Sequence, residues 1–455
     1  MMRWIPAVLA ACVAASAHLP AQAAEAGASA YVLYKDATLI DGTGAPPQGP
    51  ASILVKGERI EKVWLGNTIA FKLPPGSQVV DASGLYVLPG LVNSHEHLAT
   101  PPNRPFAEAQ MKRDLYGGVT AVRDMADDLR QVSDLARAAR VGELPGPDIY
   151  YAALMAGPEF FDDPRTHAVS AGAVAGHTPW MQAIDARTDL RMAVALARGT
   201  GASAIKIYAD LPAERVKAIT AEAHRQGIPV WAHAAVFPAK PSDVIAARAD
   251  AVSHVCMLAY EVSDPIPKAY HHRAPVDAAR LGQGDNPVIG KLLARMKAQG
   301  TVLDATLFVY AGLDASHAAH PTGPQPYCTT EIAARLTDQA RRAGVIISAG
   351  TDGFSEAADP YPALYQELEL LVARAGFTPM QAILAATAGG ARAVTANPDF
   401  GTIAAGQLAN LMFTAKDPTG DIGALRTVVM TVKRGVIYRR ADFNPQADAA
   451  QRKDD

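Results

Sequence analysis

The chain is poor in cysteine, with three among its 455 residues, and this limits what disulfides can contribute to its fold. Cys12 lies in the first 24 residues, so Cys256 and Cys328 remain for the rest of the chain. They could pair in an oxidising compartment, but two cysteines in so long a chain do not make a disulfide framework. Cys256 follows a strand-like segment, and we interpret it as a small buried hydrophobic residue. A small disulfide-stapled fold is therefore excluded.

The chain also lacks an excess of charge of either sign, because its formal net charge is -3 and no basic run or stripe occurs. Proteins that bind nucleic acid or anionic membranes carry such a patch, so neither is an implied partner. Beyond residue 24 the chain contains no uninterrupted apolar run of about 18 residues, the length that marks a membrane-spanning helix. We therefore expect no membrane span in the mature chain.

Common catalytic and nucleotide-binding motifs are missing as well. The sequence has neither the Gly-x-Ser-x-Gly elbow of serine hydrolases nor a Gly-Lys-Ser/Thr phosphate loop. Gly42-Thr43-Gly44 begins like a dinucleotide-binding loop, but Pro47 and a hairpin-like segment follow where that motif requires a helix. We interpret this segment as a turn.

Residues 1–24 have the pattern of a secretory signal peptide. They combine a positive charge at Arg3, an apolar core over 4–17 that is too short to span a bilayer, and an Ala-x-Ala site over 21–23. We therefore expect a periplasmic or secreted protein. Residues 9–12, Leu-Ala-Ala-Cys, resemble a bacterial lipobox, but Cys12 follows Arg3 closely, so lipid anchoring at Cys12 is the less favoured alternative.

The residues that are abundant predict an α/β protein of two domains. Hydrophobic residues make up 49% and charged residues 19%, a balance that can bury a large core. Short β-rich runs occur at both ends, and we expect them to meet in a small composite β-sandwich domain. Between them, eight buried strand-like runs alternate with helical patterns, which predicts a TIM-like (β/α)8 barrel. The predicted boundaries are signal peptide 1–24, β domain 25–88 and 399–442, barrel 89–398, and tail 443–455.

Titratable side chains recur where the predicted barrel strands end. In LPGLVNSHEHL, residues 88–98, alternation along a strand makes His95 and His97 project to the same side. Functional side chains of such barrels occupy the C-terminal ends of the strands, which meet at one mouth. Reading those ends adds four more residues: Lys206, His233, His254 and Asp352. Buried Lys, His and Asp are rare unless they are paired or bound to metal, so the set predicts a metal site.

The motifs around these residues resemble the metal-dependent amidohydrolase superfamily, in the branch related to imidazolonepropionase and the prolidase-like Xaa-Pro and Xaa-Arg dipeptidases. The matching text covers nearly the whole mature chain and includes VLPGLVNSHEH, GGVTAVRD, GASAIKIY, WAHA, VSHV, SAGTDG and GTIAAGQLANLMFTAKDP. One departure is Asn410, where relatives usually carry Asp. It falls in the predicted β domain, so we expect little effect on the chemistry.

The resemblance implies two divalent metal ions bridged by a carbamate that Lys206 forms with carbon dioxide. His95, His97 and Asp352 would hold the buried metal, and His233 and His254 the outer one. Zn2+ is the default identity on affinity grounds. A hydroxide shared by the metals would attack a carbonyl carbon, and Asp352 would act as general base and then general acid. Burial beside positive charge lowers the pKa of a lysine, so a neutral Lys206 amine that can react is physically reasonable.

Two further residues are candidates for substrate binding. Tyr208 stands two residues after Lys206 and therefore faces the same mouth, where its phenol could donate to the substrate oxyanion, although a packing role explains it equally well. His177 resembles a substrate-contacting histidine in a glycine-rich loop of the family. Arg273 could clamp a substrate carboxylate, but nothing in the sequence selects it over other basic residues.

Three functional hypotheses follow. The first is a hydrolase of an amide or peptide bond in a small molecule, a dipeptide or an N-acyl amino acid. The second is a mononuclear cyclic-amide hydrolase or deaminase of the same superfamily, which is disfavoured because Lys206 supplies a bridge and Ala235 and Val236 stand where deaminases usually place Glu. The third is a catalytically inactive periplasmic metal-binding protein. A homo-oligomer is compatible with the sequence, which leaves the oligomeric state open.

Overall fold

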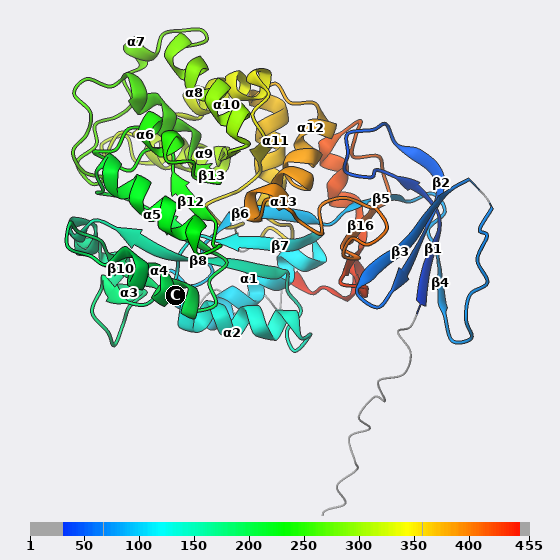
Figure 1. Cartoon of the computed structure of the whole chain (residues 1–455). Helices are drawn as coiled ribbons and strands as arrows, with labels where there is room; N and C mark the ends of the chain where they lie inside the picture. The colour runs from blue at the N-terminus through cyan, green and yellow to red at the C-terminus, as the bar shows by residue number, and fades with distance from the viewer. Residues whose placement is uncertain (1–30, 67, 357, 446–455) are drawn as a thin grey trace, which may run out of the picture.

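The computed structural model describes residues 31–66, 68–356 and 358–445 of the chain. The predicted signal peptide, Cys12 and most of the predicted tail lie outside the described residues. Figure 1 shows two bodies: a barrel surrounded by helices, and a smaller sheet beside it that combines the blue N-terminal strands with orange and red C-terminal segments. Within the described residues, no helix has both the length and the apolar character needed to cross a membrane.

Eight parallel strands form the predicted TIM-like barrel. Their order in the sheet is that of the chain, and successive strands pair in parallel. The barrel is nearly closed, because the amide of Ser94 on the first strand donates to the carbonyl of Ala349 after the last strand, at 2.9 Å. The strands are β6 (Leu91–Glu96), β7 (Val119–Asp124), β8 (Asp148–Ala156), β11 (Ala204–Ile207), β12 (Val230–His233), β13 (Ala251–Ser253), β14 (Val302–Asp304) and β15 (Ile347–Ser348).

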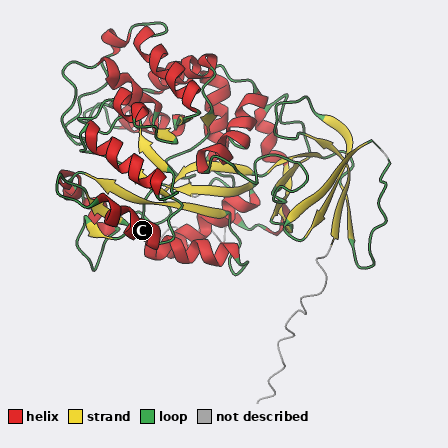
Figure 2. Ribbon diagram, in the orientation of Figure 1, coloured by secondary structure: helices red, strands yellow, loops and turns green. Residues whose placement is uncertain are grey.

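Helices cover the outside of the barrel (Figure 2). Their caps follow ordinary helix chemistry. Thr378 and Gln381 form a capping box at the start of α12, where each side chain accepts a hydrogen bond from the backbone amide of the other residue. The main outer helices are α1 (Arg104–Tyr116), α2 (Leu129–Arg140), α4 (Leu190–Gly199), α5 (Ala213–Arg225), α6 (Pro241–Ala246), α8 (Pro287–Gln299), α10 (Thr330–Ala343), α11 (Leu364–Arg374), α12 (Pro379–Ala385) and α13 (Ala388–Val394).

Shorter elements lie in the loops between strands and helices. After β8 come η1 (Pro158–Asp162), α3 (Pro164–Ala168), β9 (His177–Thr178) and β10 (Met181–Ala183). After β13 come η2 (Val255–Val262) and α7 (Ala278–Leu281), and after β14 comes α9 (Leu307–Ala319). These insertions follow the C-terminal ends of the strands, the end of the barrel at which the functional residues were predicted.

The β domain is built from both chain ends, as predicted. Strand β1 pairs along one edge with β2, and along the other edge first with β4 and then with β5, so the sheet branches there. The N-terminal part joins the C-terminal part where β5 pairs with β16. The strands are β1 (Tyr31–Leu39), β2 (Gln48–Lys56), β3 (Arg59–Leu65), β4 (Gln78–Asp81), β5 (Tyr86–Pro89), β16 (Leu411–Thr414), β17 (Val428–Lys433) and β18 (Val436–Arg439), and η3 (Ile422–Thr427) and η4 (Arg440–Asp442) complete it.

Gly90 separates the two bodies within the run that contains the paired histidines. The preceding strand β5 belongs to the small sheet and the following strand β6 to the barrel. A Cβ atom at position 90 would lie 2.3 Å from the side chain of Thr120, so only glycine fits this passage without displacement. The close passage sets where β6 enters the barrel, and with it the position of His95 and His97 at the other end of the strand.

Cys256 and Cys328 form a disulfide across 72 residues of sequence. Cys256 is fully buried, as expected. The interpretation of Cys256 as a small hydrophobic residue is corrected, because the residue forms a disulfide. The disulfide joins η2 to the segment that precedes α10. It therefore ties together two insertions that follow different barrel strands.

We expect reduction of this disulfide to lower the free energy of unfolding by about 2–4 kcal/mol, because cross-linking a long loop restricts the unfolded chain. Thermal unfolding with and without a reductant measures the effect. The Cys256→Ala/Cys328→Ala double variant is the control, and its Tm should match that of the reduced wild type and ignore the reductant. A wild-type Tm that does not change on reduction would contradict the prediction.

Candidate metal-dependent active site

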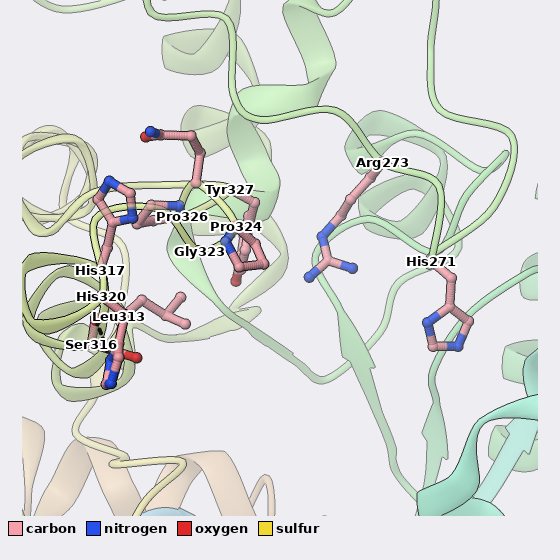
Figure 3. A pocket seen from close by; sticks show the side chains of 11 residues that line it. His271, Arg273, Leu313, Ser316, His317, His320, Gly323, Pro324, Pro326 and Tyr327 are labelled. Carbon is pink, nitrogen blue, oxygen red and sulfur yellow. Dashed lines mark hydrogen bonds between the residues drawn. The ribbon is translucent and has the colours of Figure 1, made fainter.

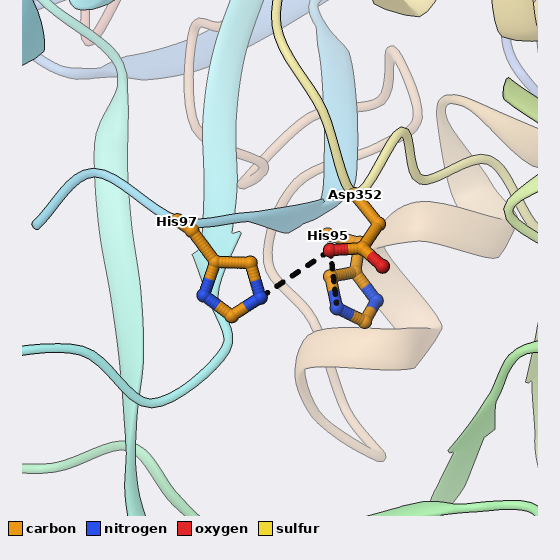
Figure 4. Close-up of side chains that lie close together, drawn as sticks. All are labelled: His95, His97 and Asp352. Atoms are coloured by element: carbon orange, nitrogen blue, oxygen red, sulfur yellow. Dashed lines mark ion pairs between the residues drawn. The ribbon is translucent and has the colours of Figure 1, made fainter. Parts of the chain in front are cut away.

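Three of the predicted residues meet at the end of β6. The ligand atoms of His95, His97 and Asp352 all lie within 4.8 Å of one another. Asp352 Oδ1 is 3.7 Å from His95 Nε2 and 3.4 Å from His97 Nε2, and Figure 4 shows this oxygen joined to both rings by dashed lines. The Asp352 amide donates to the His95 carbonyl at 3.0 Å, which ties the eighth strand end to the first. Two imidazoles and one carboxylate are a donor set that suits Zn2+ and related divalent metals.

The other three predicted residues continue the cluster around the rim. His254 Nδ1 is 3.9 Å from Asp352 Oδ2, and the His254 ring centroid is 4.8 Å from that of His95. The His233 ring is a further 4.8 Å from the His254 ring. Lys206 is the last residue but one of β11, the strand that pairs with β12, and it is completely buried. It lies close enough to His233 and Asp352 for their charges to interact. The structure thus gathers all six predicted residues at one end of the barrel.

Burial lowers the pKa of several nitrogen groups in this cluster, whereas at His97 the carboxylates of Asp127 and Asp352 outweigh burial and raise the pKa well above its ordinary value. Burial first, and then the positive charge of Arg123, lower the pKa of the Lys206 ammonium to about 7. Burial likewise lowers the pKa of His254 to about 3 and that of His233 well below its ordinary value. Neutral imidazole and amine nitrogens have the lone pairs that metal binding or carbamate formation requires.

Asp352, in contrast to Lys206 and His254, keeps its charge at neutral pH. Burial alone would raise the pKa of its carboxyl group, but the neighbouring histidines, His95 first and then His97, outweigh burial and hold the pKa below its ordinary value. The carboxylate is therefore ionised at neutral pH. It can bind a cation or accept a proton.

Two polar atoms of the cluster are buried without a partner. The Nζ of Lys206 and the Nδ1 of His233 have no hydrogen-bond partner among the described residues. A buried polar atom without a partner is costly, so such atoms usually point to a group that binds there. The residues present therefore fit a metal centre that uses Lys206 and His233 in addition to the His95, His97 and Asp352 group.

Each histidine of the first pair is oriented by a carboxylate that the sequence analysis did not identify. His95 Nδ1 lies 2.7 Å from Asp304 Oδ2, and His97 Nδ1 lies 2.7 Å from Asp127 Oδ1. These contacts leave both Nε2 atoms directed at the site, as in many metal-binding histidines. Asp304 ends β14 at the same level as the other ligands, so reading the strand ends could have found it. Asp127 lies in a loop, and no sequence signal marks it.

Tyr208 lies beside the cluster, and His177 does not. The Tyr208 ring is 4.0 Å from the His233 ring and 4.5 Å from the Phe160 ring. Tyr208, Phe160 and His97 line a small cavity of about 30 Å3. His177 lies on β9 and is exposed, and within the described residues its side chain makes no hydrogen bond or ring contact with the other predicted site residues. His177 thus lies outside the cluster, and its contact with a substrate stays a prediction.

The chain belongs to the amidohydrolase family, whose sequence pattern matches residues 86–438. This agrees with the nearly closed barrel and with the resemblance of its motifs, and it makes the protein a hydrolase that acts on C–N bonds. The match covers the whole barrel and the later strands of the β domain, because it begins at β5 and ends in β18, whereas β1 to β4 precede it.

Comparison with known proteins points to the same branch. The chain is 26% identical over 436 residues to imidazolonepropionase of Streptomyces griseus, covering 84% of this chain and 90% of the relative. Among solved structures, a Xaa-Pro dipeptidase with bound methionine superposes with a TM-score of 0.71 at 21% identity, covering 90% of this chain and 100% of that one. A protein described as a putative prolidase from Bifidobacterium longum superposes with a TM-score of 0.67 at 26% identity, covering 93% and 98%.

The carboxylates behind the histidines generate a prediction. We expect Asp304→Asn and Asp127→Asn each to weaken metal binding about 10- to 100-fold, because an amide orients the imidazole less well and does not increase its basicity. Titration of metal-depleted protein with Zn2+ measures the change. Asp128→Asn is the matched control, since Asp128 adjoins Asp127 but caps α2 and pairs with Arg130. Equal Zn2+ affinity in all three variants would contradict the assignment.

Proposed function

We propose that this chain hydrolyses the amide bond of a dipeptide or an N-acyl amino acid with the aid of two divalent metal ions, with zinc the expected metal. The observation that carries the proposal is the convergence of three histidine or carboxylate ligands within 4.8 Å beside two further histidines and a buried lysine. The names of two relatives, a Xaa-Pro dipeptidase and a prolidase, support a dipeptide as the substrate class.

The proposed ligands divide into two groups. His95, His97 and Asp352 would hold one metal, and His233 and His254 would hold the other. Lys206, as a carbamate, would contribute to both. Bound there, the metals would polarise the substrate carbonyl as Lewis acids and acidify a water molecule.

Side chains of the protein supply the remaining functions. The ionised Asp352 would accept a proton at a carboxylate oxygen during attack and return it to the leaving nitrogen. The Tyr208 phenol would donate a hydrogen bond to the carbonyl oxygen of the substrate. The Phe160 ring, which lies against Tyr208, would limit the access of bulk water.

A one-metal cyclic-amide hydrolase or deaminase is the second candidate. It is favoured by the compact His95, His97 and Asp352 group, which is sufficient for a single ion, and by the similarity to imidazolonepropionase. The buried amine of Lys206, which has no hydrogen-bond partner among the described residues, favours the two-metal site. The number of metal ions bound per chain separates the two candidates. A third candidate, an inactive metal-binding protein, predicts bound metal without turnover.

We also infer that the protein is exported. The disulfide between Cys256 and Cys328 supports this, because such bonds persist in oxidising compartments such as the periplasm and are rare in the cytosol. The signal-peptide pattern of residues 1–24 agrees with this inference.

For the proton-transfer role, we expect Asp352→Asn to lower kcat/KM by about 1,000-fold, since a positioned general base typically contributes 100- to 10,000-fold. A library of dipeptides and N-acyl amino acids, assayed with the zinc-loaded protein, provides the measurement. Asp338→Asn is the control, because Asp338 pairs with Arg341 and Arg342 outside the cluster. Hydrolysis by Asp352→Asn at the wild-type rate would refute the role.

For the bridging role, we expect the wild type to bind two Zn2+ per chain when it is reconstituted with bicarbonate, and Lys206→Met to bind one at most. A methionine has similar length and tolerates burial but cannot form a carbamate. Metal analysis after gel filtration measures the count, and added bicarbonate should help only the wild type. Lys433→Met is the matched control, because Lys433 is also buried but pairs with Asp148. Two Zn2+ bound to Lys206→Met would disprove the bridge.

A further inference from the structure

A second and larger cavity lies outside the metal cluster, and its lining is rich in basic side chains. Its volume is about 470 Å3, and its wall includes one arginine and three histidines, with Tyr327 and Gln325 among the other residues (Figure 3). No Asp or Glu belongs to this lining within the described residues. The basic residues are Arg273, His271, His317 and His320.

Arg273 is held in this wall without a carboxylate partner. Its guanidinium lies 4.1 Å from the ring centroid of Tyr270 and 4.3 Å from that of Tyr327, so two aromatic faces hold it. One Nη donates to the Tyr270 carbonyl at 2.7 Å, whereas the buried Nε has no partner among the described residues. Among those residues, no Asp or Glu lies within ion-pair distance of Arg273, so its charge is available to a ligand.

Arg165, another arginine near the cluster, has a carboxylate partner. Arg165 lines the small cavity beside His97, and its guanidinium forms a close ion pair with Asp163 at 2.7 Å. Its charge is therefore neutralised within the protein. Arg273 is the better receptor for an anionic group because no carboxylate competes with the ligand.

Ring contacts connect Arg273 to the metal cluster. The Tyr270 ring, on which Arg273 lies, is 5.6 Å from the ring of His233 and 5.4 Å from the ring of Tyr208. Only one aromatic ring thus separates the guanidinium from a proposed metal ligand. In a dipeptide or an N-acyl amino acid, the carboxylate is attached to the α-carbon next to the scissile nitrogen, so its receptor must lie near the metal cluster.

Both sides of the arginine are anchored to the segment that follows His254. Cys328, the neighbour of Tyr327, is bonded to Cys256 in η2. Tyr260, also in η2, donates from its hydroxyl to the carbonyl of Ala274, the neighbour of Arg273, at 2.7 Å. Because η2 starts directly after His254, these bonds hold the arginine and its aromatic neighbour at a defined position relative to the cluster.

We propose that Arg273 is a substrate-binding residue that receives the carboxylate of the amino acid released by hydrolysis, and that it makes the enzyme select free acids over their amides. This inference rests on the proposed function. The planar guanidinium offers paired donors to a carboxylate, whereas a neutral carboxamide gains much less from a fixed cation. The larger cavity then accommodates the side chain of that amino acid.

The experiment compares paired substrates with two variants of Arg273. The substrates are glycyl-L-amino acids and N-acetyl-L-amino acids, each with its C-terminal primary amide, and kcat/KM is measured for both members of each pair. We expect Arg273→Met to lower kcat/KM for the acids by roughly 30- to 100-fold, mainly through KM, and to change that for the amides less than about threefold. Arg273→Lys keeps the charge but not the planar fork, so an intermediate loss is expected. The control is Arg187→Met, which removes an exposed arginine that pairs with Asp185.

A binding measurement separates failure of this inference from failure of the proposed function. Calorimetry with L-leucine and L-leucinamide uses ligands without an acylated amine, so it does not depend on turnover. Tighter binding of leucine to the wild type, lost in Arg273→Met, supports the carboxylate site even if no paired substrate is cleaved, in which case only the proposed function fails. Two results would overturn the assignment. One is a ratio of kcat/KM for acid over amide that is the same in the wild type and in Arg273→Met. The other is equal affinity of the wild type for leucine and leucinamide.

Discussion

The site depends on a single buried carboxylate, that of Asp304. It accepts hydrogen bonds from His95 at 2.7 Å, from the hydroxyl of Ser253 at 2.9 Å and from the guanidinium of Arg123 at 3.2 Å, and its other oxygen accepts from Ser94 at 3.0 Å. These donors belong to β6, β7 and β13, so one side chain of β14 links four strands. A buried charge is stable only when it is paired and hydrogen-bonded, and removal of one partner typically costs about 3–5 kcal/mol. The network therefore stabilises the barrel and orients a proposed metal ligand at the same time.

Three residues that follow strands in the second half of the barrel have an unfavourable backbone conformation. His254, Thr306 and Asp352 have φ values of 70°, 54° and 50°, in the left-handed region that non-glycine residues seldom adopt. Each such residue costs about 1–2 kcal/mol. This conformation directs the side chains of His254 and Asp352 to the rim. It also places the Thr306 hydroxyl 3.0 Å from His254 Nδ1, within hydrogen-bond distance. Strain of this kind is maintained where the surrounding structure holds functional groups in place.

The rim and the larger cavity are joined through η2. This segment follows His254, contains Cys256 and Tyr260, and so contacts both the proposed metal ligands and the walls around Arg273. A shift of η2 would move a proposed metal ligand and the proposed carboxylate receptor together. One short segment, held by the disulfide, thus fixes the distance between these two proposed parts of the site.

The sequence alone determined the barrel, the composite β domain and the placement of six titratable residues at one rim. These features follow from alternation along strands and from the rule that parallel strands end at the same face, both of which are local or topological. Only the tertiary structure decided which partner each side chain meets. Asp304 and Asp127 became visible as histidine partners, Cys256 was joined to Cys328, Arg273 was distinguished from other arginines, and His177 was left exposed outside the cluster. The reason is physical: strand position is encoded in periodicity, whereas the contacts of a loop residue depend on where distant parts of the chain bring their side chains.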